Sequence, residues 1–160
     1  MEMKYCTNCL MPSTRPRIQY NSDGVCNACT WSVKKKEIDW NKRWSVLEEM
    51  CDKHRSRNKD KFDVIVPYSG GKNGAYIAYT LKEKLGMNPL CVTIKPPMED
   101  PIALESIKNF TDLGYDHLFI TPNRQLERKI DKDNLINRGI PMHAFMIVVQ
   151  TAIMRTAVNF

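Results

Sequence analysis

Four of the six cysteines have the spacing of a metal site. Cys6 and Cys9 form one Cys-x-x-Cys pair, and Cys26 and Cys29 form a second, with sixteen residues between the pairs. Each pair can direct two thiolates at one ion, and two pairs complete the tetrahedral shell of zinc. Ligand type and spacing favour zinc over iron, disulfides or chance. Because four cysteines leave no open coordination position, we predict a structural zinc ribbon over residues 1–31, which folds only with its ion.

A second stretch with chemical potential spans residues 63–74 and reads Asp-Val-Ile-Val-Pro-Tyr-Ser-Gly-Gly-Lys-Asn-Gly. Its β-branched run predicts a buried strand, and a helix is expected over 73–85. A strand, a glycine turn and a helix N-terminus make an anion cradle, to which Lys72 adds a mobile positive charge. We predict that this loop binds the phosphates of a nucleotide, and a glycine turn without a ligand is the alternative. The binding residues are Ser69, Gly70, Gly71, Lys72, Asn73 and Gly74.

The loop does not match two common nucleotide motifs. A Walker A loop reads Gly-x-x-x-x-Gly-Lys-Ser/Thr, whereas here Lys72 is followed by Asn73 and the upstream glycine is missing. The dinucleotide pattern Gly-x-Gly-x-x-Gly is also absent from the loop.

Alternating strand and helix patterns position this loop. Further strands are expected at 89–94 and 117–121, and further helices at 102–113, 122–137 and 143–160. Strands joined by helices predict an α/β fold with an open parallel sheet and helices on both faces. Ligands of such sheets bind beyond the carboxyl ends of the strands, which is where the loop follows the first strand.

The chain divides into three segments by composition. The ribbon at 1–31, with a short strand at 17–20, precedes a charged helical connector at 32–61 and an α/β domain at 62–160. Within the connector we expect a helix over about 39–53 that is capped by Asp39. The basic run at 53–61 fits a solvated connector better than a nucleic-acid contact, because no aromatic residue is interleaved. Since only three strands precede the last apolar helix, we expect a fragment or shortened form of a longer protein.

Overall composition sets broad limits on function. The chain has 160 residues, is 42% hydrophobic and carries a net charge of +6. It shows no membrane span and no signal-peptide core, so we expect a cytoplasmic protein. The charge is compatible with nucleic acid, a nucleotide or an anionic sugar nucleotide, and does not choose among them.

The loop Ser69-Gly70-Gly71-Lys72-Asn73-Gly74 resembles the Ser-Gly-Gly-x-Asp-Ser loop of the PP-loop ATP pyrophosphatases, which have an adenine nucleotide alpha hydrolase-like fold. Nearly the whole chain is similar to the N-acetyl sugar amidotransferases of surface-polysaccharide biosynthesis, such as lipopolysaccharide and O-antigen synthesis. That family is considerably longer. The segments that carry the resemblance are 5–12, 14–16, 24–29, 38–40, 113–117 and 121–123.

The resemblance implies a reaction. ATP, bound with magnesium, would activate the carbonyl oxygen of an N-acetyl group on a sugar or sugar nucleotide. Ammonia from a glutaminase partner, delivered through a channel subunit, would displace AMP and give an acetamidino group. Lys72 would act as a catalytic residue by stabilising charge on the phosphates. Nucleic acid is not an expected partner of this family.

The sequence departs from the family pattern at two positions of the loop. Asn73 replaces an acid and Gly74 replaces a serine, so the loop lacks a carboxylate and a hydroxyl. Asn73 can still cap the following helix. His143 matches a histidine of the family. Two other functions stay open: a tRNA-modifying PP-loop enzyme, and a non-catalytic zinc-ribbon and nucleotide-binding fragment.

Overall fold

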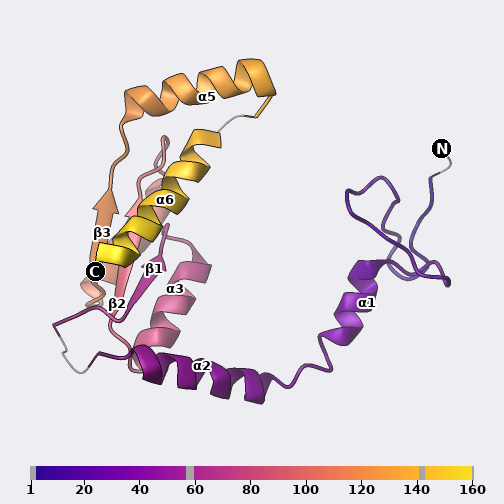
Figure 1. The fold of residues 1–160 in the computed structure, drawn as a ribbon, viewed down its shortest axis with the longest axis horizontal. Helices are drawn as coiled ribbons and strands as arrows, with labels where there is room; N and C mark the ends of the chain where they lie inside the picture. Colours follow the sequence, from indigo (N-terminus) through magenta and orange to yellow (C-terminus); the bar gives the residue numbers. More distant parts are fainter. Residues whose placement is uncertain (1–2, 57–59, 141–142, 160) are drawn as a thin grey trace. The chain divides into compact units, whose positions relative to one another are not determined.

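A computed structural model describes residues 3–56, 60–140 and 143–159, with only the backbone described at 143–145. The chain forms two compact units, Met1–Leu47 and Glu48–Phe160 (Figure 1). Among the described helices, none has the length and apolar character needed to cross a membrane.

The first unit consists of loops followed by helix α1 (Asn27–Lys34). Isolated bridges join Tyr5 to Pro12 and Tyr20 to Cys26. The predicted strand at 17–20 is wrong, because Arg17 has a left-handed φ of 64° that interrupts any extended run. The side-chain amide of Asn27 stabilises this turn by donating a hydrogen bond from Nδ2 to the Arg17 carbonyl at 3.2 Å.

Helix α2 (Trp40–His54) begins in the first unit and ends in the second. Asp39 caps it as predicted, since its Oδ1 accepts a hydrogen bond from the Lys42 amide at 3.0 Å. The basic run that follows falls partly on residues 57–59, which lie outside the described residues.

The second unit is built on a three-stranded parallel sheet in the order β1 (Val64–Pro67), β2 (Pro89–Ile94), β3 (His117–Ile120). In its register Val66 pairs with Cys91, and Cys91 pairs with His117. The predicted open parallel sheet is therefore confirmed, and its carboxyl edge lies where β1, β2 and β3 each end.

Helices cover both faces of this sheet, as predicted (Figure 1). The helices on the sheet are α3 (Lys72–Tyr79), its π-helical continuation η1 (Thr80–Lys84), α4 (Pro101–Asp112) and α6 (His143–Asn159), whereas α5 (Arg124–Arg138) packs against α6. On one face Ala78 of α3 and Ile107 of α4 pack in a buried cluster with Val66 and Cys91. On the other face α6 packs against the side chains of β2. The alternation of side chains along each strand thus gives the sheet two apolar faces.

Candidate functional site

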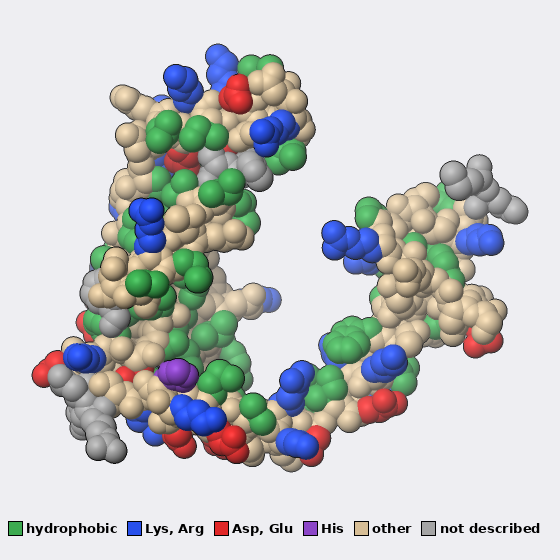
Figure 2. Space-filling view, viewed as in Figure 1, with side chains coloured by type: hydrophobic (Ala, Val, Ile, Leu, Met, Phe, Trp, Pro, Cys, Tyr) green, Lys and Arg blue, Asp and Glu red, His purple; other side chains and the backbone are tan. Residues whose placement is uncertain are grey.

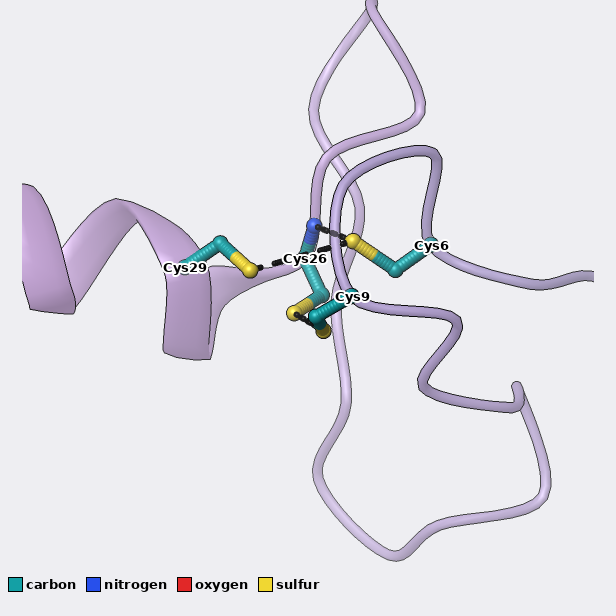
Figure 3. A group of neighbouring side chains, drawn as sticks. All are labelled: Cys6, Cys9, Cys26 and Cys29. Carbon is teal, nitrogen blue, oxygen red and sulfur yellow. Dashed lines mark hydrogen bonds between the residues drawn. The ribbon is translucent and has the colours of Figure 1, made fainter.

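The four predicted cysteines meet in the first unit (Figure 3). Their sulfur atoms all lie within 4.8 Å of one another. The Sγ atoms of Cys6 and Cys29 are 4.0 Å apart, and those of Cys9 and Cys26 are 3.6 Å apart. A tetrahedral zinc ion with Zn–S bonds of about 2.3 Å requires sulfur separations of roughly 3.8 Å. The two printed separations lie close to that value, so the cluster fits one zinc ion.

Backbone hydrogen bonds prepare Cys6 for metal binding. Burial raises the pKa of its thiol, but N–H groups donating to its sulfur outweigh burial and bring that pKa to about 6. The Cys26 amide donates at 3.2 Å and the Asn8 amide at 3.4 Å. Since a thiolate is the form that binds zinc, these backbone N–H groups favour the ligating state of Cys6.

In the first unit, a glycine and a tyrosine hold together the segments that carry the two Cys-x-x-Cys pairs. Gly24 has a φ of 75°, and an added Cβ there would lie 2.9 Å from Cγ2 of Thr7. The Tyr20 hydroxyl donates to the Met11 carbonyl at 2.7 Å. Such contacts replace a hydrophobic core, because only cysteine side chains are well buried among the described residues of this unit.

The predicted nucleotide loop lies at the carboxyl edge of the sheet, directly after β1. Ser69 is exposed, and Gly70 has a left-handed φ of 82°. A Cβ added to Gly70 would lie 2.7 Å from the Cα atom of Ala103, in the first turn of α4. Glycine is therefore required at this position both for the turn and for the close approach of α4.

Gly71 provides the open side of the loop. It occupies the N-cap position of α3 with φ −89° and ψ 159°, and no side chain caps the helix. A Cβ added there would have only the Ser69 hydroxyl oxygen as a neighbour, at 3.8 Å. The first-turn N–H groups of α3 and the positive end of its dipole thus face open space, which suits an anion. The predicted cap by Asn73 is wrong, because Asn73 lies inside the first turn.

Gly74 is a packing requirement of this chain. A Cβ there would lie 2.7 Å from Cδ2 of Tyr68 and 3.1 Å from the carbonyl oxygen of Pro67. Tyr68 is 2% exposed, and its hydroxyl lies 3.0 Å from Oγ of Ser106. A serine at position 74 cannot be accommodated while Tyr68 keeps this place, which explains the glycine in structural terms.

Lys72 is the first residue of α3 and its side chain is exposed. No ion pair involves it within the described residues. A mobile ammonium beside an uncapped helix N-terminus can neutralise a phosphate.

A cavity of about 180 Å³ adjoins the loop. It connects Ser69 to the carboxyl ends of β2 and β3 and to the first turns of α4. Sequence reasoning missed this cavity, although the run from Thr93 to Pro96 follows the strand rule for ligand sites. The lining residues are Ser69, Thr93, Ile94, Lys95, Pro96, Glu99, Asp100, Ala103, Leu104, Ile107 and Phe119.

Arg124 fixes the segment that lines this cavity after β2. Its Nη2 donates to the carbonyl oxygens of Lys95 and Pro96, each at 2.7 Å. Its Nη1 is 2.8 Å from Oε2 of Glu127, whose side chain is only 4% exposed. A buried carboxylate thus orients the guanidinium that holds the lining segment in place.

Aromatic side chains extend from the sheet to the cavity. The His117 ring stacks on Phe119 with centroids 4.5 Å apart, and Lys95 Nζ lies 5.6 Å from the Phe119 centroid. His117 Nε2 is 2.7 Å from the hydroxyl of Thr93, and burial lowers the pKa of His117. Phe119 itself is 43% exposed and lines the cavity. His143 begins α6, and its side chain lies outside the described residues.

Comparisons with known proteins assign this chain to no family. No family model matches the chain. The uncharacterized protein MJ1599 of Methanocaldococcus jannaschii is 29% identical over 107 residues, which cover 66% of this chain and 38% of that protein. A crystal structure of a predicted subunit of tRNA methyltransferase from the same organism is 30% identical, covering 56% of this chain and 44% of that chain with a TM-score of 0.40.

The chain thus spans about two fifths of the length of the relatives it matches. Neither relative is described as an amidotransferase, so these matches give the expected amidotransferase family no support. The structure itself shows a three-stranded parallel sheet with flanking helices in the second unit and a four-cysteine cluster in the first unit.

Proposed function

We propose that this chain binds ATP at residues 69–74 and adenylates an oxygen atom of its substrate, the reaction of PP-loop ATP pyrophosphatases. The observation that carries this proposal is the uncapped start of α3 at Gly71, open to solvent and adjoined by a cavity at the carboxyl edge of the sheet. The triphosphate would lie at the first turn of α3, and the adenine in the cavity against Phe119.

In the proposed reaction a substrate oxygen attacks the α-phosphorus of ATP. A new P–O bond forms, the bond to the oxygen bridging the α- and β-phosphates breaks, and pyrophosphate leaves. A nitrogen nucleophile then forms a bond to the activated carbon while the carbon–oxygen bond breaks and AMP leaves. Lys72 and the first-turn amides of α3 stabilise the charge that gathers on the phosphates. Magnesium is expected with ATP, and Glu99 and Asp100 supply carboxylates in the cavity lining.

Two substrate classes fit this chemistry. The sequence resemblance favours the N-acetyl group of a sugar or sugar nucleotide, with ammonia from a glutaminase partner. RNA is the second candidate, and the observation that favours it is an exposed tryptophan, Trp31, bordered by basic side chains in the first unit. A cytoplasmic location, where ATP and both substrate classes occur, belongs to the same proposal.

Product analysis distinguishes these possibilities. The zinc-loaded chain is incubated with ATP, magnesium and ammonia, together with either N-acetyl sugar nucleotides or tRNA, and AMP and pyrophosphate are quantified. We expect both products in equal amounts with one substrate class, and a strong decrease on Lys72→Ala. ATP binding without pyrophosphate from either class would reduce the chain to a nucleotide-binding fragment, and ADP with phosphate would refute the reaction type.

A further inference from the structure

Helix α1 exposes a tryptophan between two hollows in the surface of the zinc unit. The Trp31 side chain is 57% exposed and lines both hollows, whose volumes are about 290 Å³ and 360 Å³. Trp31 contributes neither to the metal cluster nor to a buried core. A large aromatic side chain kept in solvent beside concave surface is characteristic of a binding site.

The smaller hollow presents two arginines from a rigid turn. Arg15 and Arg17 line it together with Trp31. The turn is closed by the Ile18 amide, which donates to the Arg15 carbonyl at 3.3 Å. The Asn27 side chain donates to the Arg17 carbonyl, and the Asn27 amide donates to the Gln19 carbonyl at 2.8 Å. Arg17 keeps a left-handed backbone there although glycine would adopt it at lower cost.

The larger hollow, which Trp31 also lines, adds a lysine and polar side chains. Lys34 and Gln19 line it, and Lys34 begins a run of three lysines. No acidic residue is among the described residues that line either hollow. In Figure 2, blue basic side chains are visible on the unit that contains α1. Cationic side chains therefore line both hollows that Trp31 borders.

This combination matches the chemistry of a single-stranded nucleic acid. An exposed indole face stacks on a base, while guanidinium and ammonium groups contact the flanking phosphates. A neutral sugar could stack on the indole but would leave three cations without partners. Polar hydrogen-bonding groups such as the Gln19 amide suit the edges of an unpaired base or a ribose hydroxyl.

We propose that the surface formed by Arg15, Arg17, Trp31 and Lys34 binds single-stranded RNA, with one base stacked on Trp31. This inference rests on the proposed function in one respect, namely that the bound RNA is the substrate that is adenylated. RNA binding itself does not require the ATP loop. One base stacked on an aromatic side chain contributes about 1–3 kcal/mol, so loss of the indole should weaken binding roughly 5- to 150-fold.

The test measures anisotropy of a fluorescein-labelled uridine dodecamer with the full zinc-loaded chain and its variants. Trp31→Ala is expected to weaken binding within that range. Trp40→Ala is the matched control, because Trp40 is 58% exposed in the same unit and lines neither hollow. Arg17→Gly removes a cation yet should fold at least as well, since glycine adopts a positive φ freely. It is expected to reduce the slope of log affinity against log salt by about 0.7.

The outcomes separate this inference from the ATP proposal. ATP affinity and zinc content are measured for every variant and should stay unchanged. Three results would overturn the inference and leave the ATP proposal intact. They are equal weakening of RNA binding by Trp31→Ala and Trp40→Ala, an unchanged salt slope for Arg17→Gly, and no RNA binding by the wild type. If an N-acetyl sugar nucleotide displaced the labelled RNA and unlabelled RNA did not, the surface would be assigned to sugar nucleotides. That result would also overturn the inference of RNA binding.

Discussion

Gly71→Asp separates anion binding by the loop from stability of the fold. Gly71 occupies the N-cap of α3 in the extended conformation that aspartate favours there, and a Cβ meets no atom closer than the Ser69 hydroxyl at 3.8 Å. An aspartate cap would accept first-turn N–H bonds and favour the helix dipole. The free energy of unfolding should therefore rise by a few tenths of a kcal/mol.

The same carboxylate would repel the triphosphate. At a separation of about 4 Å, each pair of unit charges costs roughly 1 kcal/mol in water and roughly 4 kcal/mol near a protein surface. Even the lower figure predicts a decrease in ATP affinity of about fivefold for each phosphate charge so placed. Helix stability and ATP affinity should thus change in opposite directions.

Isothermal titration with ATP and thermal unfolding measure the two effects on one sample. Gly71→Asn is the matched control, because asparagine caps a helix about as well as aspartate and adds similar bulk without charge. We expect Gly71→Asp to lose far more ATP affinity than Gly71→Asn. Unchanged ATP affinity in Gly71→Asp, in a protein that remains folded, would refute the assignment of the anion site to this loop.

Three further predictions concern the metal, the loop packing and pH. We expect one zinc ion per wild-type chain, and Cys26→Ser should abolish zinc binding and unfold the first unit. Elemental analysis of freshly prepared, reduced wild-type protein measures the zinc content, and a value near zero would contradict the metal site. Gly74→Ala should destabilise the second unit by up to about 2 kcal/mol in urea unfolding, because overpacking against Tyr68 costs about 1–3 kcal/mol and the helix propensity of alanine regains about 1 kcal/mol. A stabilised variant would contradict this. Since burial lowers the pKa of His117, its contribution to stability is complete above the unfolded pKa of about 6.5 and is lost as pH falls below it. His117→Gln should therefore show a smaller loss of stability between neutral and acidic pH, and an identical loss would contradict the burial argument.

The sequence was sufficient for the features that depend on local patterns. The Cys-x-x-Cys spacing predicted the cluster that Cys6 and its three partners form, and short apolar runs that alternate with helical patterns predicted all three strands of the sheet. Alternation with helices predicted the parallel order, because parallel strands need a crossover. Asp39 was a correct cap because its side chain bonds only within the next turn.

Features that depend on tertiary contacts could not be predicted. The left-handed Arg17 is stabilised by Asn27, ten residues later, so no local signal excluded a strand there. Asn73 has a capping side chain, yet the turn at Gly70 places Gly71 at the cap. The role of Gly74 depends on Tyr68, whose ring fills the space that a serine side chain at position 74 would need. The cavity could not be predicted either, because its walls come from two strands and from α4, which only the tertiary fold brings together.

The central claim is that ATP binds at the start of α3, and its most direct test is a residue-resolved ¹⁵N–¹H correlation spectrum of the zinc-loaded chain during titration with ATP and magnesium. We expect the largest shifts for the amides of Ser69, Gly70, Gly71 and Lys72, with smaller shifts for Thr93 and Phe119 along the cavity. Shifts confined to another surface, or none at millimolar ATP, would contradict it.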